Sequence, residues 1–263
     1  MKKLILTGML AMALFPAQAH ADSMFDGTWK IDMNSVHLPK KPDMFLLKDG
    51  MYECKTCTPA IQIKADGQDQ SVTGHPYFDT VAVKVVDDHT IQETDKKNGK
   101  VVTTSTTTVA PDGKTASFEF TDSSASNAQP ITGKGTSMRV AEGPAGSHAI
   151  SGSWRVSSFS NYSDNGLAVT YKSNGDNMTM TNPTGQTYTA KMDGTEAPMS
   201  GDPGITNVSV RMMGKRTLVE TDKRSGKTIG VMKATVSADG KTMMASYHND
   251  LQGRTTSWRA MKE

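Results

Sequence analysis

The stretch Glu93-Thr94-Asp95-Lys96 recurs as Glu220-Thr221-Asp222-Lys223, at an offset of 127 positions (220 − 93). Three other phrases recur at the same offset: Lys64-Ala65-Asp66-Gly67 as Lys191-Met192-Asp193-Gly194, Gly74-His75-Pro76 as Gly201-Asp202-Pro203, and Asp112-Gly113-Lys114-Thr115 as Asp239-Gly240-Lys241-Thr242. Because the matches share one offset, the central part of the chain aligns with itself without gaps. Such self-similarity indicates a tandem duplication of one folding unit.

The outer parts of the two copies also correspond, with small changes in length. Gly27-Thr28-Trp29-Lys30 matches Gly152-Ser153-Trp154-Arg155, and Thr136-Ser137-Met138-Arg139 matches Thr256-Ser257-Trp258-Arg259. Between the copies, residues 141–149 are rich in Gly, Pro and Ser, which favour a connecting segment. We therefore expect two domains, at 22–140 and 150–263, each of the usual size of a small domain and joined by this linker.

Within each copy the apolar residues repeat at every second position. Val81, Val83 and Val85 follow this rule in the first copy, and Met178 and Met180 follow it in the second. Such alternation predicts strands with one face toward a core. Pairs that tolerate the positive φ values of tight hairpins separate the runs: Asp49-Gly50, Asp66-Gly67, Asn98-Gly99, Asp112-Gly113, Asn174-Gly175, Asp193-Gly194, Ser225-Gly226 and Asp239-Gly240. We predict an all-β fold of two tandem up-and-down antiparallel barrels with about eight strands each; two open sandwiches are the alternative.

The Gly-x-Trp near the start of each copy, together with an Arg near its end, resembles the signature of the lipocalin and calycin family. In that family the Trp closes one end of the barrel and the Arg packs across its ring, which gains cation–π energy. The resemblance implies that Trp29 pairs with Arg139 and that Trp154 pairs with Arg259. The mature chain also resembles an uncharacterised proteobacterial family of secreted, tandem lipocalin-like proteins, through phrases such as Thr73-Gly74-His75-Pro76-Tyr77.

The first residues have the pattern of a secretory signal peptide. Lys2 and Lys3 precede an apolar run, and the small-residue pattern Ala19-His20-Ala21 predicts cleavage before Asp22. No later segment approaches the roughly 20 apolar residues that span a bilayer, so we expect a periplasmic or secreted protein that does not span the membrane. Without Lys2 and Lys3 the formal charges balance at 27 against 27. No basic face indicates nucleic-acid binding.

Cys54 and Cys57 are the only cysteines. In an oxidising compartment we expect a local disulfide between them, which would pin a turn. Redox chemistry and metal ligation are the alternatives; redox catalysis needs a thiol of depressed pKa, usually at a helix N-terminus, which an all-β chain does not offer. None of the six histidines lies in an HExxH motif, and no short cluster supplies the ligands that zinc expects. No cofactor is expected.

His75 and Tyr77 lie in the connection Gly74-His75-Pro76-Tyr77-Phe78-Asp79, where a barrel mouth would present aromatic side chains. The matching stretch of the second copy, Gly201-Asp202-Pro203-Gly204-Ile205-Thr206, lacks them. This difference makes the first loop a candidate contact site, with a plain surface loop as the alternative. The sequence contains neither a Gly-x-Ser-x-Gly elbow nor a phosphate-binding loop, so an enzymatic role is not favoured.

Many of the 18 methionines lie in the second copy. Met can line an adaptable apolar pocket, although core filling is the alternative. We hypothesise an exported, non-catalytic protein whose barrel interior, that of the Met-rich second copy, binds a small apolar molecule or lipid. The candidate contact residues are Met178, Met180, Tyr188, Met232, Met243, His75 and Tyr77. Other hypotheses are a structural or partner-binding module of the cell envelope, and binding of copper or zinc through Cys, His and Met.

Overall fold

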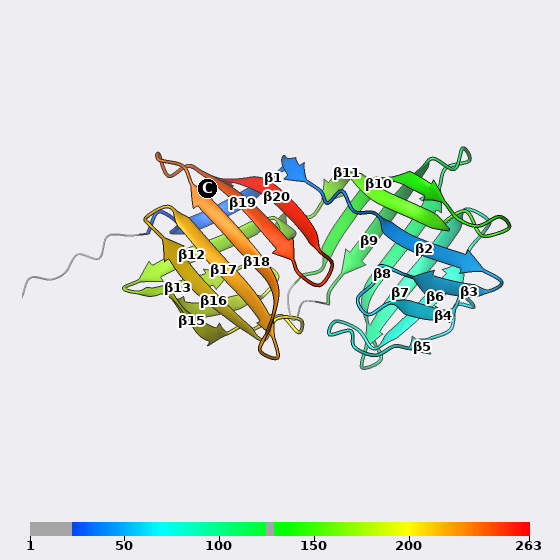
Figure 1. The fold of residues 1–263 in the computed structure, drawn as a ribbon, viewed down its shortest axis with the longest axis horizontal. Coiled ribbons are helices and arrows are strands. Elements are labelled where there is room, and N and C mark those ends of the chain that lie inside the picture. Colours follow the sequence, from blue (N-terminus) through cyan, green and yellow to red (C-terminus); the bar gives the residue numbers. More distant parts are fainter. Residues whose placement is uncertain (1–22, 125–128) are drawn as a thin grey trace, which may run out of the picture.

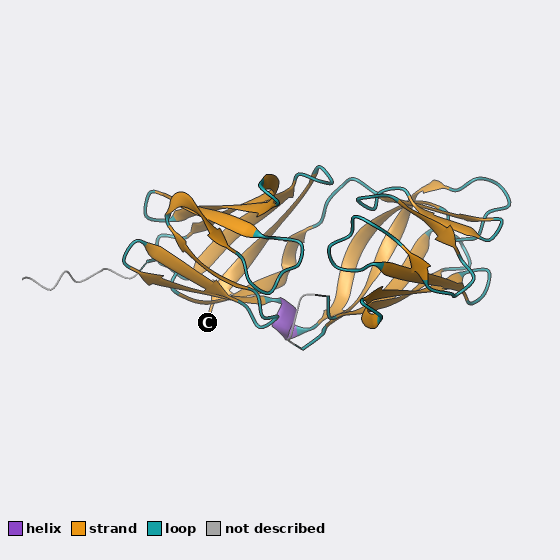
Figure 2. Cartoon of the chain, turned by 90° about the horizontal axis from the view of Figure 1, so that it is seen from below, coloured by secondary structure: helices purple, strands orange, loops and turns teal. Residues whose placement is uncertain are grey.

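The computed structural model describes residues 23–124 and 129–263, so the expected signal peptide lies outside the described residues. The predicted all-β fold is confirmed, because two antiparallel sheets of ten strands each form nearly closed barrels, which lie side by side (Figure 1). The one described helix is a single 3-10 turn, Asp164–Gly166, between the barrels (Figure 2). Among the described residues, no helix is long and apolar enough to cross a membrane.

We call the barrel that consists of ten consecutive strands the N-barrel. Its strands are β2 (Asp43–Lys48), β3 (Met51–Cys54), β4 (Ile61–Lys64), β5 (Gln70–Ser71), β6 (Thr80–Val85), β7 (Thr90–Lys97), β8 (Lys100–Val109), β9 (Thr115–Asp122), β10 (Ile131–Glu142) and β11 (Gly152–Tyr162). The ten strands exceed the expected number of about eight, because a strand as short as β5 leaves no alternation in the sequence.

The other barrel is called the C-barrel. Its strands are β1 (Gly27–His37), β12 (Ala168–Asn174), β13 (Asn177–Thr181), β14 (Thr187–Lys191), β15 (Asp193–Pro198), β16 (Asn207–Met213), β17 (Thr217–Arg224), β18 (Lys227–Val236), β19 (Thr242–Asn249) and β20 (Arg254–Lys262). It therefore combines the first strand of the chain with the last nine.

The first strand of each sequence copy lies in the barrel of the other copy. β1 pairs with β12 and β20 and so completes the C-barrel, where blue β1 lies beside red β20 in Figure 1. β11, the matching strand of the second copy, pairs with β10 and β2 in the N-barrel. The expected domain boundary at 141–149 therefore needs correction, because this stretch joins β10 to β11 inside the N-barrel. The chain instead crosses between the barrels at 38–42 and 163–167.

The connection between β1 and β2 disfavours a hairpin between these two strands. Its sequence, Leu38-Pro39-Lys40-Lys41-Pro42, contains two prolines. Proline lacks the N–H group and pushes the residue before it toward extended backbone, so the segment does not form the tight turn of a hairpin. β10 and β11, in contrast, are joined by hydrogen-bonded turns, in which Ser147 N donates to Pro144 O and Ser151 N donates to His148 O.

A buried tryptophan marks the same position in both barrels. Trp29 on β1 and Trp154 on β11 are at most 3% exposed. The Nε1 of each donates to the carbonyl oxygen four residues earlier, Phe25 O and Ile150 O, at 2.7 Å in both cases. Each ring packs into the apolar core of its own barrel.

The expected pairing of Trp154 with Arg259 is wrong, because β11 lies beside the last strand of the first copy. Arg139 on β10 lies over Trp154, with Cζ 4.1 Å from the ring centroid. Its guanidinium also donates to Ser151 O and Ala149 O, each at 2.6 Å, and to Gly113 O. Arg139 therefore fixes the β10–β11 connection as well as the ring.

The expected pairing of Trp29 with Arg139 is wrong for the same reason. Lys262 faces Trp29, with Nζ 5.3 Å from the ring centroid. Arg259 instead forms an ion pair with Asp32 and is about half exposed. The two copies thus differ in the cation that covers the tryptophan.

Replacing Arg139 by Lys should destabilise the N-barrel, whereas Arg259→Lys should change stability by less than about 0.5 kcal/mol. Lysine cannot reproduce the planar fork of the guanidinium, and losing hydrogen bonds from a charged donor costs about 1.5–3 kcal/mol. Urea unfolding, followed by circular dichroism, measures both free energies. Equal losses in the two variants would contradict the role assigned to Arg139.

Candidate functional site

The methionines that were expected to contact a ligand lie together in the filled core of the C-barrel. Met178, Met180 and Met243 are at most 6% exposed, and Met232 packs against the same apolar cluster of the C-barrel. Tyr188 is also buried there and donates its hydroxyl hydrogen bond to Glu220. These side chains fill the interior that was expected to hold a ligand.

An open space lies in the interior of the N-barrel. A cavity of about 350 Å³ is bounded by side chains from seven strands of this barrel, β2, β3 and β7–β11. Its apolar wall consists mainly of Phe45, Ile91, Ala116, Phe118, Ile150, Trp154 and Val156. Its polar groups include Tyr52, Glu93, Ser105, Thr107 and Ser137. A mainly apolar wall with a few polar groups is typical of small-molecule sites.

Three positions hold a larger side chain in the filled barrel than in the open one. The strand register makes Ser105, opposite Glu93, equivalent to Met232, opposite Glu220. The same comparison relates three small cavity-lining residues to methionines: Cys54 to Met180, Ser105 to Met232 and Ala116 to Met243. The larger Tyr52 is equivalent to Met178. Methionine is flexible and fills irregular gaps. The abundance of Met in the second copy therefore accompanies a filled interior.

Phe118 can form one wall of the cavity because Gly135, on the neighbouring strand, leaves room for its ring. A Cβ on Gly135 would lie 2.6 Å from the Phe118 ring and 2.4 Å from the Ser158 carbonyl oxygen, so a side chain there would displace the ring. The equivalent pair in the C-barrel has the reverse sizes, Ala245 opposite Trp258. The two interiors thus have different shapes although the strands of the two barrels are arranged in the same way.

Two carboxyl groups point inward from β7. Glu93 lines the cavity, and Asp95, on the same face of the strand, is 7% exposed. Tyr52 Oη donates to Glu93 Oε2 at 3.3 Å. Burial raises the pKa of Glu93, and the Tyr52 hydrogen bond opposes this shift. Burial, together with the charges of Glu93 and Asp122, raises the pKa of Asp95 to about 8.

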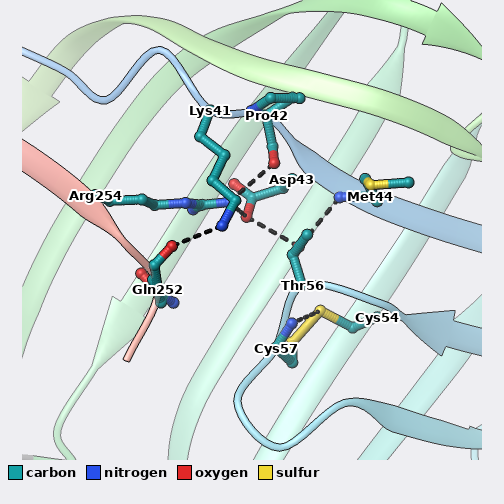
Figure 3. Close-up of polar contacts among 9 residues, drawn as sticks. All are labelled: Lys41, Pro42, Asp43, Met44, Cys54, Thr56, Cys57, Gln252 and Arg254. Atoms are coloured by element: carbon teal, nitrogen blue, oxygen red, sulfur yellow. Dashed lines mark hydrogen bonds and ion pairs between the residues drawn. A yellow bond between two sulfur atoms is a disulfide. The ribbon is translucent and has the colours of Figure 1, made fainter. Parts of the chain in front are cut away.

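One end of the cavity is bordered by a turn from the C-barrel. Gln252, between β19 and β20, belongs to the cavity wall. Beside it, Arg254 donates to Asp43 Oδ1 at 2.8 Å and to Pro42 O at 2.9 Å, and Lys41 donates to Gln252 O at 2.8 Å (Figure 3). Both barrels therefore contribute to the site.

The expected disulfide between Cys54 and Cys57 is confirmed. Between the two cysteines, Thr56 donates to Asp43 Oδ1 at 3.2 Å and accepts from Met44 N at 3.1 Å (Figure 3). The disulfide loop is thereby attached to β2 beside Gln252. The disulfide leaves no free thiolate for a metal, and within 23–124 and 129–263 no group of three or more His, Cys, Asp or Glu is placed to hold a metal ion.

His75 and Tyr77 are not part of the cavity wall. Tyr77 Oη donates to Asp202 Oδ1 at 2.9 Å, and the His75 ring stacks on Phe78 with centroids 4.6 Å apart. Asp202 lies in the matching loop of the second copy, so the two equivalent loops contact each other. In the structure they form a contact between the barrels.

No family model matches the chain, and no curated protein matches it. The tandem arrangement of two nearly closed barrels is shown by the structure, whereas membership of the lipocalin family stays a prediction.

Sequence reasoning did not identify the cavity or its acidic residues. A signal was available in β7, because Glu93 and Asp95 share the parity of apolar Ile91, and residues of one parity face the same side of a strand. Tyr52 gave a similar signal, because it lies two positions from Cys54 and therefore on the same face of β3. Gln252 gave no such signal, because it comes from the other barrel.

Proposed function

We propose that the N-barrel cavity binds one small, mainly apolar molecule, and that the chain is an exported, non-catalytic binding protein of the lipocalin-like kind. The observation that carries this proposal is the contrast between two interiors built on one strand plan. A cavity lowers the stability of a barrel, and the four methionines of the C-barrel demonstrate that side chains can fill this scaffold. The open volume of about 350 Å³ lies within the usual range of ligand sites, about 300–1,000 Å³.

In this proposal the C-barrel supports the site and does not bind a second molecule. It supplies Gln252 to the cavity wall, and its Arg254 binds Asp43 beside that wall. The buried methionines of the C-barrel leave the binding role to the first copy. The ligand-binding hypothesis is thereby retained, but its location moves to the other interior.

Phenethyl alcohol is a suitable probe, because it carries one aromatic ring and one hydroxyl group. Titration into the full-length protein should shift the NMR signal of the Trp154 indole N–H, because this ring lines the cavity. The indole N–H of Trp29, which lies in the core of the C-barrel, should not shift. Shifts at Trp29 alone, or at neither ring, would contradict binding in the N-barrel.

Ala116→Met should weaken binding of this probe at least about tenfold, because the wider side chain copies Met243 and occupies the cavity. Ser117→Met is the matched control: it adds the same side chain to the exposed face of β9 and should leave binding unchanged. Ser105→Met, which copies Met232, provides a second test if Ala116→Met does not fold. Unchanged affinity in a folded Ala116→Met or Ser105→Met variant would overturn the proposed site.

A further inference from the structure

We propose, building on the function above, that the ligand of the N-barrel cavity is a small arylalkyl amine, bound as its ammonium ion against Glu93. The two sequence copies contain the same pair of inward acids, but their surroundings differ. Glu93 lines an open cavity, whereas the equivalent Glu220 is buried in the filled C-barrel.

In the C-barrel, a tyrosine hydroxyl group satisfies one of the two acids. Tyr188 donates a hydrogen bond to Glu220. Glu220 and Asp222 are at most 8% exposed, although Asp222 Oδ1 has no partner among the described residues. In the filled barrel, Glu220 thus has a partner from the protein itself.

In the N-barrel, the tyrosine that contacts the glutamate comes from another strand. The position equivalent to Tyr188 on β14 holds Ile61 on β4. Tyr52 offers one hydroxyl to Glu93. Asp95 Oδ1 is buried, and the described part of the chain gives it no hydrogen-bond partner. As in the C-barrel, the Glu has one Tyr donor and the Asp has one oxygen without a partner; the difference is that Glu93 lines an open cavity.

Among the described residues, the cavity wall contains no basic side chain that could neutralise these acids. Tyr52 from β3 hydrogen-bonds to Glu93, and the negative charges of Glu93 and of Asp122 from β9 act on Asp95. Arg254, at the edge of the cavity, is engaged by Asp43. An ammonium group supplies the missing charge and donors, and hydrogen bonds between charged groups are roughly twice as strong as neutral ones.

Aromatic side chains favour a ring as the body of the ligand. Phe45, Phe118 and Trp154 line the cavity from three different strands. Aromatic rings pack against one another in offset or edge-on arrangements and exclude water from the neighbouring charge pair. A short chain between ring and ammonium lets the ring contact these walls while the cation reaches Glu93.

Three compounds with one ring and different charge test the proposal on the full-length protein. Phenethylamine should bind at least about tenfold more tightly than phenethyl alcohol in calorimetry at neutral pH, which corresponds to about 1.4 kcal/mol. Phenylacetate should bind more weakly than both, because its charge repels Glu93. Equal or tighter binding of the alcohol would overturn the amine proposal and leave the proposed function intact. Absence of binding by all three would contradict the proposed function as well.

Glu93→Gln should remove the preference for the amine and leave the affinity for the alcohol within about twofold. Gln has the shape of Glu and removes a buried acid, so the variant should fold. Glu220→Gln is the matched control, because it changes the equivalent acid in the filled C-barrel and should leave amine affinity unchanged. An amine preference that persists in Glu93→Gln, or that disappears in Glu220→Gln, would overturn the assignment of Glu93.

Discussion

Residues 42–163 should fold alone, whereas residues 22–140 should not. The first fragment contains all strands of the N-barrel, β2–β11, so each strand keeps its neighbours. The second lacks β11 and carries β1 without its partners β12 and β20. It would expose the edges of β2 and β10. It would also lack buried Trp154, and loss of a core Trp side chain alone costs about 3–5 kcal/mol.

Thermal unfolding followed by circular dichroism and NMR distinguishes the two fragments. The fragment 42–163 should give dispersed signals and one cooperative transition, at a lower temperature than the intact chain because it loses contacts such as Arg254–Asp43. The fragment 22–140 should give neither. As a control, a synthetic peptide of residues 23–37 should restore cooperative unfolding to 168–263, because it supplies β1. A monomeric, cooperatively folded 22–140 would contradict the observed strand exchange.

Local signals in the sequence were sufficient to predict the fold class. Asp49, Asn98 and Ser225 were expected at hairpin turns, and each has a φ of 51° between two paired strands. Turn residues and the period of two depend on neighbouring positions alone, so they can be recognised without tertiary information. The same local signals do not determine which strands become neighbours.

The choice of neighbours for β1 could not be derived from its pattern. β1 and β11 both carry Gly-x-Trp, and both bury the Trp in the same way. The Gly-x-Trp pattern therefore does not distinguish the two strands. The prolines at 39 and 42 disfavour a hairpin between β1 and β2, but they do not indicate which barrel β1 joins.

The cavity could not be predicted because it depends on residues that face one another across a barrel. The Met pattern fitted two interpretations, a ligand pocket and a filled core, and the observed burial favours the filled core. Ser105 and Ala116 leave space only because no larger side chain enters from the opposite wall. A sequence gives the size of each residue but not the size of the residue that it faces.

Stability should fall as the pH rises from 5 to 8. Burial, followed by the charge of Asp222, raises the pKa of Glu220 to about 8, and burial raises the pKa of Asp222 to about 6. In the unfolded chain such carboxyls ionise near about 4. Above that pH the unfolded state releases protons that the native state keeps, so the stabilisation present at low pH is lost as pH rises through the native pKa. Asp222 alone accounts for about 3 kcal/mol, and Asp95 acts in the same direction in the N-barrel.

Asp222→Asn should therefore stabilise the C-barrel at pH 8 by about 3 kcal/mol, because the amide cannot ionise in the unfolded chain. Asp239→Asn is the control: hydrogen bonds from Ser237 and Lys241 lower the pKa of this exposed acid, so its replacement should not stabilise the protein at pH 8. Urea unfolding at pH 5 and at pH 8 measures the difference for both variants. A wild-type free energy of unfolding that rises with pH, or an Asp222→Asn variant less stable than wild type at pH 8, would mean that the native barrel accommodates the ionised pair. Proton retention by the buried acids would then no longer explain how the filled barrel tolerates them.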